Sequence, residues 1–180
     1  MITLPAAGDG GERTVTRKVA INFEEVASAM EDRRGYNEYF LDLQSGELEV
    51  IPTELLGWES YDGEKVADLP DWEQDLIPIV REIEEGTDRY EAVPTVPSYE
   101  VYNLMVEFAE TVSDQGLRRL LLVALDGIGA FRRFKDVLGD YPEERERWFA
   151  MKDAVMNERV REWLGELGIE AVERRADSEP

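Results

Sequence analysis

The sequence contains no cysteine and no histidine among its 180 residues. Without cysteine the chain can form no disulfide and has no thiolate nucleophile. Without histidine it lacks the side chain that most often moves protons near neutral pH. The two absences also exclude Cys/His zinc sites and the Ser-His-Asp and Cys-His catalytic arrangements. Any catalysis would therefore depend on carboxylates, Lys, Tyr, Ser/Thr or a carboxylate-bound metal.

Long apolar runs are missing as well. No window of the sequence approaches the roughly 18 continuous apolar residues of a membrane span, and the N-terminus has no basic start followed by an apolar run. We therefore expect a cytoplasmic protein without a membrane partner. The sequence also shows no internal repeat and no low-complexity tract.

The composition is that of a folded globular protein. Hydrophobic residues make up 43% of the chain, which has four Trp, seven Tyr and six Phe, so a hydrophobic core can form. We expect a flexible leader at 1–13, an acidic α+β part at 14–97, a helical subdomain at 98–168 and a frayed tail at 169–180. Residues 14–168 are expected to form one compact unit.

The charge is unevenly distributed along the chain. Asn22 to Gln115 contain 25 acidic and 5 basic residues, a balance of −20, whereas Gly116 to Trp163 contain 9 acidic and 10 basic residues, a balance of +1. Such an acidic half repels phosphates and favours a basic protein partner. The alternative is that the acidity only maintains solubility or reflects a saline cytoplasm.

The N-terminal half predicts a small antiparallel sheet. Alternating apolar residues indicate a β-hairpin with strands at Tyr36–Leu43 and Leu48–Ile51, joined by a Ser45-Gly46 turn. Arg89–Val93 reads as a third strand that could join the hairpin. Thr14–Ile21 is β-branched enough for a short strand or an extended arm.

Two helices are predicted in the same half. Asn22 has the features of a helix cap, since Glu25 follows three residues later as in a capping box, and this helix should end before Gly35. Asp71–Glu85 is also helical by its apolar spacing, with Pro78 either kinking the helix or marking its first turn.

The intervening residues 53–70 are expected to form a loop anchored by Trp58 and Tyr61, whereas Trp148 and Trp163 belong to an apolar helix face. We interpret all four Trp residues, including Trp72, as anchors of the core or of a subdomain interface.

From residue 98 onward the pattern is entirely helical. Ser98 is expected to cap the first helix, Gly127 to end the second in a left-handed conformation, and Pro142 to open a long last helix that runs to Gly168. The residues predicted to face the core are Val101, Met105, Phe108, Val112, Leu117, Leu120, Leu121, Ala124, Leu125, Phe131, Phe134, Leu138, Trp148, Met151, Val155, Met156, Val160, Trp163, Leu164 and Leu167. The predicted fold is therefore α+β: a small antiparallel sheet of the hairpin plus one strand, with flanking helices, packed on a C-terminal helical subdomain.

One candidate anion site lies between two of these helices. Gly127 and Gly129 break one helix and start another, which leaves free backbone N–H groups at a helix N-terminus, where partial positive charge collects. Arg132, Arg133 and Lys135 follow within two turns. The alternative is that Gly127 is a C-cap, Gly129 allows close helix packing and the arginines pair with the acidic half of the same molecule.

Three pieces of the chain resemble one bacterial family. They are Tyr39-Phe40-Leu41-Asp42-Leu43 with Gly46-Glu47, then Asp88-Arg89-Tyr90, then the run Gly129 to Asp136 (GAFRRFKD) followed by Tyr141-Pro142 and Trp148-Phe149. The likeness covers roughly residues 20 to 168. The family is a group of small acidic bacterial proteins known only as an uncharacterised protein family. The resemblance therefore implies family membership, with no assigned activity or cofactor.

Two functions lead from the sequence, and an enzyme is the third reading. The leading hypothesis is a non-enzymatic interaction protein whose acidic surface meets a basic protein partner. The alternative is a phosphate or nucleic-acid binding module that uses the Gly127–Gly129 hairpin and the adjacent arginines for a small phosphorylated ligand or a single nucleic-acid phosphate. We assign no catalytic residue, no metal ligand and no cofactor, because no nucleophile with an adjacent base is visible.

Overall fold

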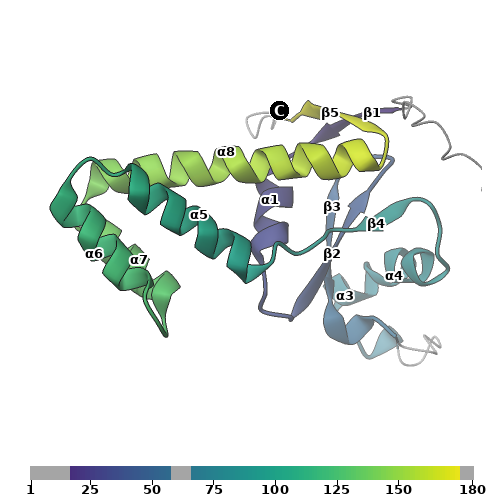
Figure 1. Ribbon diagram of the computed structural model, residues 1–180. Coiled ribbons are helices and arrows are strands. Elements are labelled where there is room, and N and C mark those ends of the chain that lie inside the picture. The colour runs from purple at the N-terminus through teal and green to yellow at the C-terminus, as the bar shows by residue number, and fades with distance from the viewer. Residues whose placement is uncertain (1–16, 58–65, 175–180) are drawn as a thin grey trace, which may run out of the picture.

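The computed structural model describes residues 17–57 and 66–174 (Figure 1). Their elements are β1 (Arg17–Ile21), α1 (Phe23–Glu31), β2 (Asn37–Asp42), β3 (Leu48–Pro52), the 3-10 helix η1 (Thr53–Leu55), α3 (Asp71–Gln74), α4 (Ile77–Glu84), β4 (Tyr90–Ala92), α5 (Ser98–Thr111), α6 (Gln115–Leu125), α7 (Ala130–Gly139), α8 (Pro142–Glu166) and β5 (Ile169–Glu173). The predicted α+β class is confirmed. The expected leader and the loop anchors Trp58 and Tyr61 lie outside the described residues.

The predicted hairpin and third strand form one antiparallel sheet of order β3-β2-β4. Phe40 of β2 is opposite both Glu49 of β3 and Ala92 of β4. The hairpin turn requires glycine because Gly46 has a φ of +76°, and an added Cβ would overlap the carbonyl oxygen of Ala20 in β1. The turn is therefore held against the neighbouring β1 strand.

The expected frayed tail is wrong for residues 169–173, which form β5 and pair in parallel with β1. Val19, Ile21 and Ile169 are all buried at this pairing. The strand is short and follows α8 directly, so its own periodicity gives little signal, and its partner lies at the other end of the chain. The pairing brings the two ends of the described chain together.

The helix boundaries confirm some of the predicted signals and correct others. The Asn22 side chain caps α1 by accepting hydrogen bonds from the N–H groups of Glu24 and Glu25. The helix expected at 71–85 is instead two helices, with Pro78 in the first turn of α4, where its missing N–H costs no hydrogen bond. Ser98 is the first residue of α5 rather than its cap, because Pro97 occupies the N-cap position.

Three hydrophobic clusters hold the structure together. One joins α5, α6, α7 and the start of α8 and contains Phe108, Phe134 and Trp148. The second joins β1, α1, the sheet and the second half of α8, and the third packs α4 on the other face of the sheet. The helices α6 and α7 project from the rest of the molecule and are named here the arm. In Figure 1, α8 runs the length of the molecule, from the arm to the β1–β5 pair. This helix is thus the element that joins the helical and α+β parts.

Several residues expected in the core are exposed. The prediction that Phe131, Leu120 and Val155 face the core is wrong. Their side chains are 38%, 51% and 41% exposed, respectively. The buried stripes of α6 and α7 are narrower than predicted, since α7 buries Ala130, Phe134 and Leu138 one helical turn apart. None of the described helices is long and apolar enough to cross a membrane.

Candidate functional site

The Gly127–Gly129 turn between α6 and α7 lies at the lower tip of this helix pair, which projects from α8 away from the sheet (Figure 1). α6 ends at Leu125 with Asp126 as its C-cap, and α7 begins at Ala130. Gly127 and Gly129 have φ values of +81° and +79°, so both adopt the left-handed conformation that glycine permits. The left-handed stop predicted at Gly127 is present, and Ile128 between the glycines is fully exposed.

Arg133 stabilises this turn. Its Nη2 donates a hydrogen bond to the carbonyl oxygen of Asp126, and its backbone N–H donates to the Gly129 carbonyl at 3.1 Å. A helix leaves its last carbonyl groups without intrahelical partners, and a cationic donor there is favourable. The guanidinium of Arg133 is therefore engaged with the end of α6.

Arg132 and Lys135 extend into solvent. Arg132 Nε lies 3.8 Å from Asp136 Oδ2, and the two side chains are 90% and 68% exposed. An exposed pair of this kind contributes about 0.5 kcal/mol or less. Lys135 is also exposed. Within the described residues, neither predicted arginine pairs with the acidic N-terminal half, and the three cations do not converge on the glycine turn.

An ion pair that the sequence pattern did not predict joins the buried Asp42, at the end of β2, to Arg89, whose side chain is 35% exposed. Asp42 is only 2% exposed and accepts hydrogen bonds from Arg89 Nη2 at 2.8 Å and Nε at 3.2 Å. The N–H of Gln44 donates to the same carboxylate at 2.7 Å, and Arg89 Nη1 lies 3.2 Å from Glu82 Oε2. The sequence contains a signal for this pair: Asp42 lies between Leu41 and Leu43, and a carboxylate buried in an apolar strand needs a cationic partner.

Two forces act in opposite directions on the pKa of Asp42. Burial raises this pKa, whereas hydrogen bonds from Arg89 and Gln44 lower it, and the net result lies below the ordinary value of 3.8. The same pair raises the pKa of Arg89. Both groups are therefore charged across the physiological range, which is typical of a structural ion pair rather than a proton-transfer site.

A second acidic group is held ionised near α1. The Tyr39 hydroxyl donates a 2.6 Å hydrogen bond to Asp32 Oδ2, and Arg34 Nε donates to Oδ1 at 3.0 Å. The Tyr39 hydrogen bond, with the backbone and side chain of Arg34, lowers the pKa of Asp32 to about 2, and the same contact raises the pKa of Tyr39. Neither group can exchange a proton near neutral pH, so this contact is also structural.

Trp72 contradicts the expectation that all four tryptophans anchor the core. Trp148 is buried and Trp163 is partly buried, but Trp72 is 58% exposed on α3. Exposed Asp71 precedes Trp72 and exposed Asp75 follows three residues later, whereas the adjacent Glu73 is buried. None of the three hydrophobic clusters of the described residues includes this exposed tryptophan.

The residues that carry the family resemblance have mainly structural contacts. Phe134 and Trp148 pack edge to face with ring centroids 5.1 Å apart, and each also contacts Phe108. Asp42 and Arg89 form the ion pair at the end of β2, and Gly46 makes the β-hairpin turn possible. The site geometry thus explains why these residues stand where they do without indicating a reaction.

The fold and these contacts define an α+β protein in which one long helix joins a small sheet to a projecting helical arm. The chain belongs to the uncharacterised protein family UPF0158, whose family model matches residues 58–178. This confirms the family membership that the signature predicts.

Curated relatives are bacterial. The chain is 29% identical over 147 residues to a UPF0158 protein of Pseudomonas aeruginosa, covering 82% of this chain and 80% of the relative. It is 31% identical over 98 residues to a UPF0158 protein of Chlamydia trachomatis, covering 54% of this chain. Only 30% of the chlamydial protein is spanned by that match. No solved structure matches the chain.

Proposed function

We propose that the protein is a non-enzymatic interaction protein whose acidic N-terminal half binds a basic protein segment. The observation that carries this proposal is Trp72, which is 58% exposed beside Asp71 and Asp75. Tryptophan is enriched among the residues that dominate binding energy in interfaces, and its ring attracts Lys and Arg cations. The flanking carboxylates would hold the same cation by charge-assisted hydrogen bonds.

The surroundings of Trp72 supply further negative charge. Exposed acidic residues of the α3–α4 layer, named here the acidic layer, are Asp68, Asp71, Asp75, Glu84, Glu85 and Asp88. A concentration of like charge raises the rate at which an oppositely charged partner arrives, and this effect weakens as salt screens it. The acidic layer would therefore steer a basic segment toward Trp72.

The test is a titration of a labelled arginine-rich peptide, followed by fluorescence anisotropy at low salt. Trp72→Ala leaves the net charge unchanged, yet we expect it to weaken binding by about tenfold, since a lost cation–π contact is worth roughly 1–2 kcal/mol. The paired change Asp71→Asn with Asp75→Asn should also weaken binding and reduce its dependence on salt.

The matched control is Glu107→Gln with Glu110→Gln, which removes the same charge from exposed positions of α5. It should have a smaller effect than the α3 pair. Equal losses from the two pairs, together with unchanged binding by Trp72→Ala, would show that the peptide responds only to net charge. That outcome rejects a specific site at Trp72.

Anion binding at the Gly127–Gly129 hairpin stays a prediction. One observation favours it: within the described residues, no side chain caps the N-terminus of α7. If inorganic phosphate binds there, titration should shift the amide NMR signals of Ala130 and Phe131, and Arg132→Ala should weaken the response. Shifts that are absent from these amides, or equal in Arg132→Ala, would exclude the hairpin as a phosphate site.

A further inference from the structure

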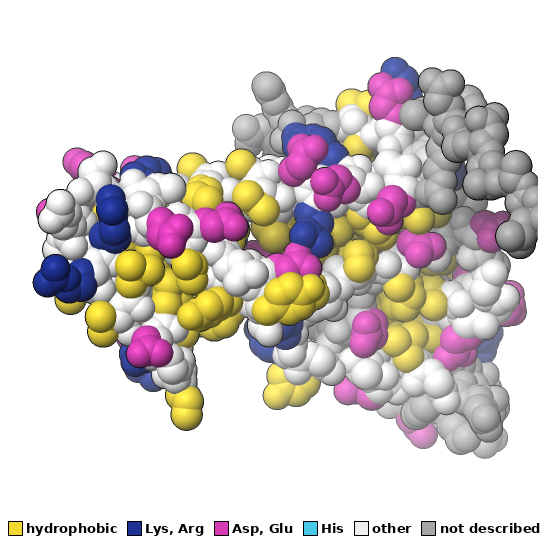
Figure 2. All heavy atoms as spheres, in the orientation of Figure 1, with side chains coloured by type: hydrophobic (Ala, Val, Ile, Leu, Met, Phe, Trp, Pro, Cys, Tyr) yellow, Lys and Arg dark blue, Asp and Glu magenta, His cyan; other side chains and the backbone are white. Residues whose placement is uncertain are grey.

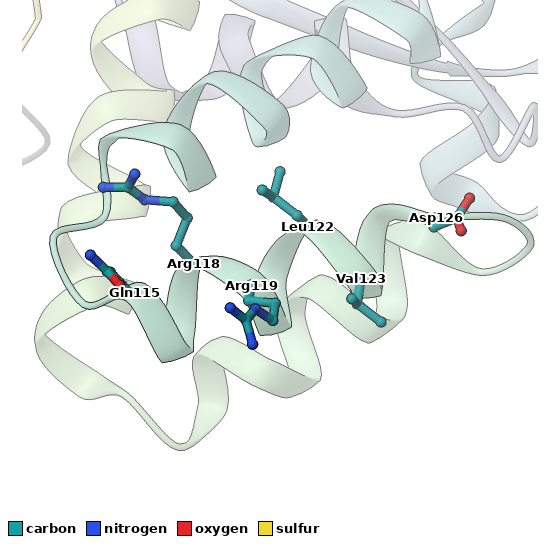
Figure 3. Close-up of a pocket in the computed structure, with 6 residues that line it drawn as sticks. All are labelled: Gln115, Arg118, Arg119, Leu122, Val123 and Asp126. Atoms are coloured by element: carbon teal, nitrogen blue, oxygen red, sulfur yellow. The ribbon is translucent and has the colours of Figure 1, made fainter.

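One side of α6 faces solvent along its whole length. The six residues on this side, named here the α6 stripe, are Gln115, Arg118, Arg119, Leu122, Val123 and Asp126, and they border a surface hollow of about 450 Å³. Figure 3 shows their side chains following the helix from its start to the turn before α7. Leu122 is 39% exposed and Val123 is 64% exposed. On the face seen in Figure 2, hydrophobic side chains gather over the α5–α6 end.

The stripe has an ordered sequence of charges. Arg118 and Arg119 lie near its beginning, the apolar Leu122 and Val123 lie at its centre, and Asp126 lies at its end. Arg118 donates to the Val112 carbonyl at 2.6 and 2.8 Å. Within the described part of the chain, by contrast, the side chains of Arg119 and Asp126 have no hydrogen bond or ion pair. The stripe is thus positive at one end, negative at the other and apolar between them.

We infer that the α6 stripe docks on the same stripe of a second copy of this chain, with the two α6 helices antiparallel. Consider a two-fold axis that passes between Leu122 and Val123. Leu122 of each copy then faces Val123 of the other, and Arg119 faces Asp126 at both ends of the contact. Because a two-fold interface brings one patch against itself, only a surface with this opposed order of charges satisfies both ends.

The distribution of charge also favours this end of the molecule for contact. Residues 115–139 contain five basic and two acidic residues, a balance of +3, although the whole chain has a net charge of −21. The arm projects away from the acidic layer (Figure 1). Contact through the arm therefore keeps the two acidic halves apart. Salt screens the repulsion between exposed charges that are separated by more than the Debye length, which is about 8 Å at physiological ionic strength.

The size of the contact determines its strength. The stripe spans eleven residue steps of helix, or about 16 Å. One pair of helices of that length buries less surface than the roughly 1,600 Å² of a standard stable interface. We therefore expect a dimer that dissociates on dilution. This surface is separate from Trp72, so the dimer and the proposed basic partner are tested independently.

Sedimentation equilibrium of the full chain over a concentration series tests the dimer. The wild-type mass should rise from 20.6 kDa toward twice that value as concentration increases. Val123→Glu should weaken association by about 100-fold, because it places two carboxylates at the apolar centre. Val155→Glu, an equally drastic change at an exposed position of α8, should leave association unchanged.

A charge exchange tests the antiparallel register. Arg119→Glu alone and Asp126→Arg alone should each weaken self-association by about tenfold or more, since each homodimer then contains two like-charge pairs. An equimolar mixture of these two variants should associate again, because both pairs in the mixed dimer are of opposite charge. Recovery in the mixture requires residue 119 of one copy to meet residue 126 of the other, and a general loss of folding cannot produce it.

Three results would overturn the inference. A wild-type chain that keeps the monomer mass up to about 1 mM has no dimer of useful affinity, and the inference is then wrong. Equal weakening by Val123→Glu and Val155→Glu places the contact elsewhere. Failure of the mixed variants to associate rejects the antiparallel register.

Discussion

Replacing Trp148 by alanine is expected to lower the free energy of unfolding by about 4 kcal/mol, the range found when a buried aromatic side chain is truncated. Trp148 is 2% exposed. Its ring lies 5.4 Å from the centroid of Phe108 and 5.1 Å from that of Phe134, and both contacts are edge to face. These rings join α5, α7 and α8, so the cavity would weaken the packing of α5 and α7 on the long helix.

The measurement is urea unfolding followed by circular dichroism, which does not depend on the fluorescence of the replaced residue. The control is the same substitution at the exposed Trp72, which should change stability by no more than about 0.5 kcal/mol. A Trp148 variant that unfolds at the same urea concentration as the Trp72 variant would show that the aromatic cluster does not hold the helices together.

The elements that could be predicted are those whose signals are local. Asn22 caps α1 because its side chain reaches N–H groups two and three residues away, and α8 begins at Pro142 because the first helical N–H needs no partner. The hairpin around Gly46 was also predictable, since its turn and its alternating strands are adjacent in sequence. In each case the stabilising contact lies within a few residues.

The parts that could not be predicted depend on distant partners. β5 forms because the hydrogen bonds of β1, about 150 residues earlier, are available to it. The exposure of Phe131, Leu120 and Val155 has the same origin, because periodicity gives the apolar face of a helix but not how much of it a neighbour covers. The width of that cover is set by tertiary packing.

The candidate anion site illustrates the same limit for side chains. The sequence places Arg132, Arg133 and Lys135 close to the glycine turn, but long cationic side chains take the direction of the partner they find. Arg133 finds the Asp126 carbonyl and Arg132 approaches Asp136, one helical turn further on. Proximity in sequence therefore does not by itself make cationic side chains converge on a turn.

The ion pair between Asp42 and Arg89 leads to the second prediction. Asp42→Asn should lower the free energy of unfolding by about 2 kcal/mol at neutral pH, because it removes the charge-assisted hydrogen bonds of a buried carboxylate whose arginine partner is only partly buried. Asparagine can still accept the hydrogen bond from Gln44 at its Oδ1, but the NH2 group that then replaces Oδ2 can accept neither hydrogen bond from Arg89. Asp136→Asn, in an exposed pair with Arg132, is the matched control and should cost no more than about 0.5 kcal/mol.

The difference between wild type and Asp42→Asn should also depend on pH. The folded-state pKa of Asp42 lies below its ordinary value of 3.8, so ionised Asp42 stabilises the folded state fully above the unfolded-state pKa of about 3.9. This contribution is lost as pH falls through the folded-state pKa. Urea unfolding at pH values from about 7 down to 3 should therefore show the two stabilities converging as the solution becomes more acidic. A difference that stays constant over this range, or one no larger than that of the Asp136 control, would mean that the charge pair between Asp42 and Arg89 does not stabilise the sheet.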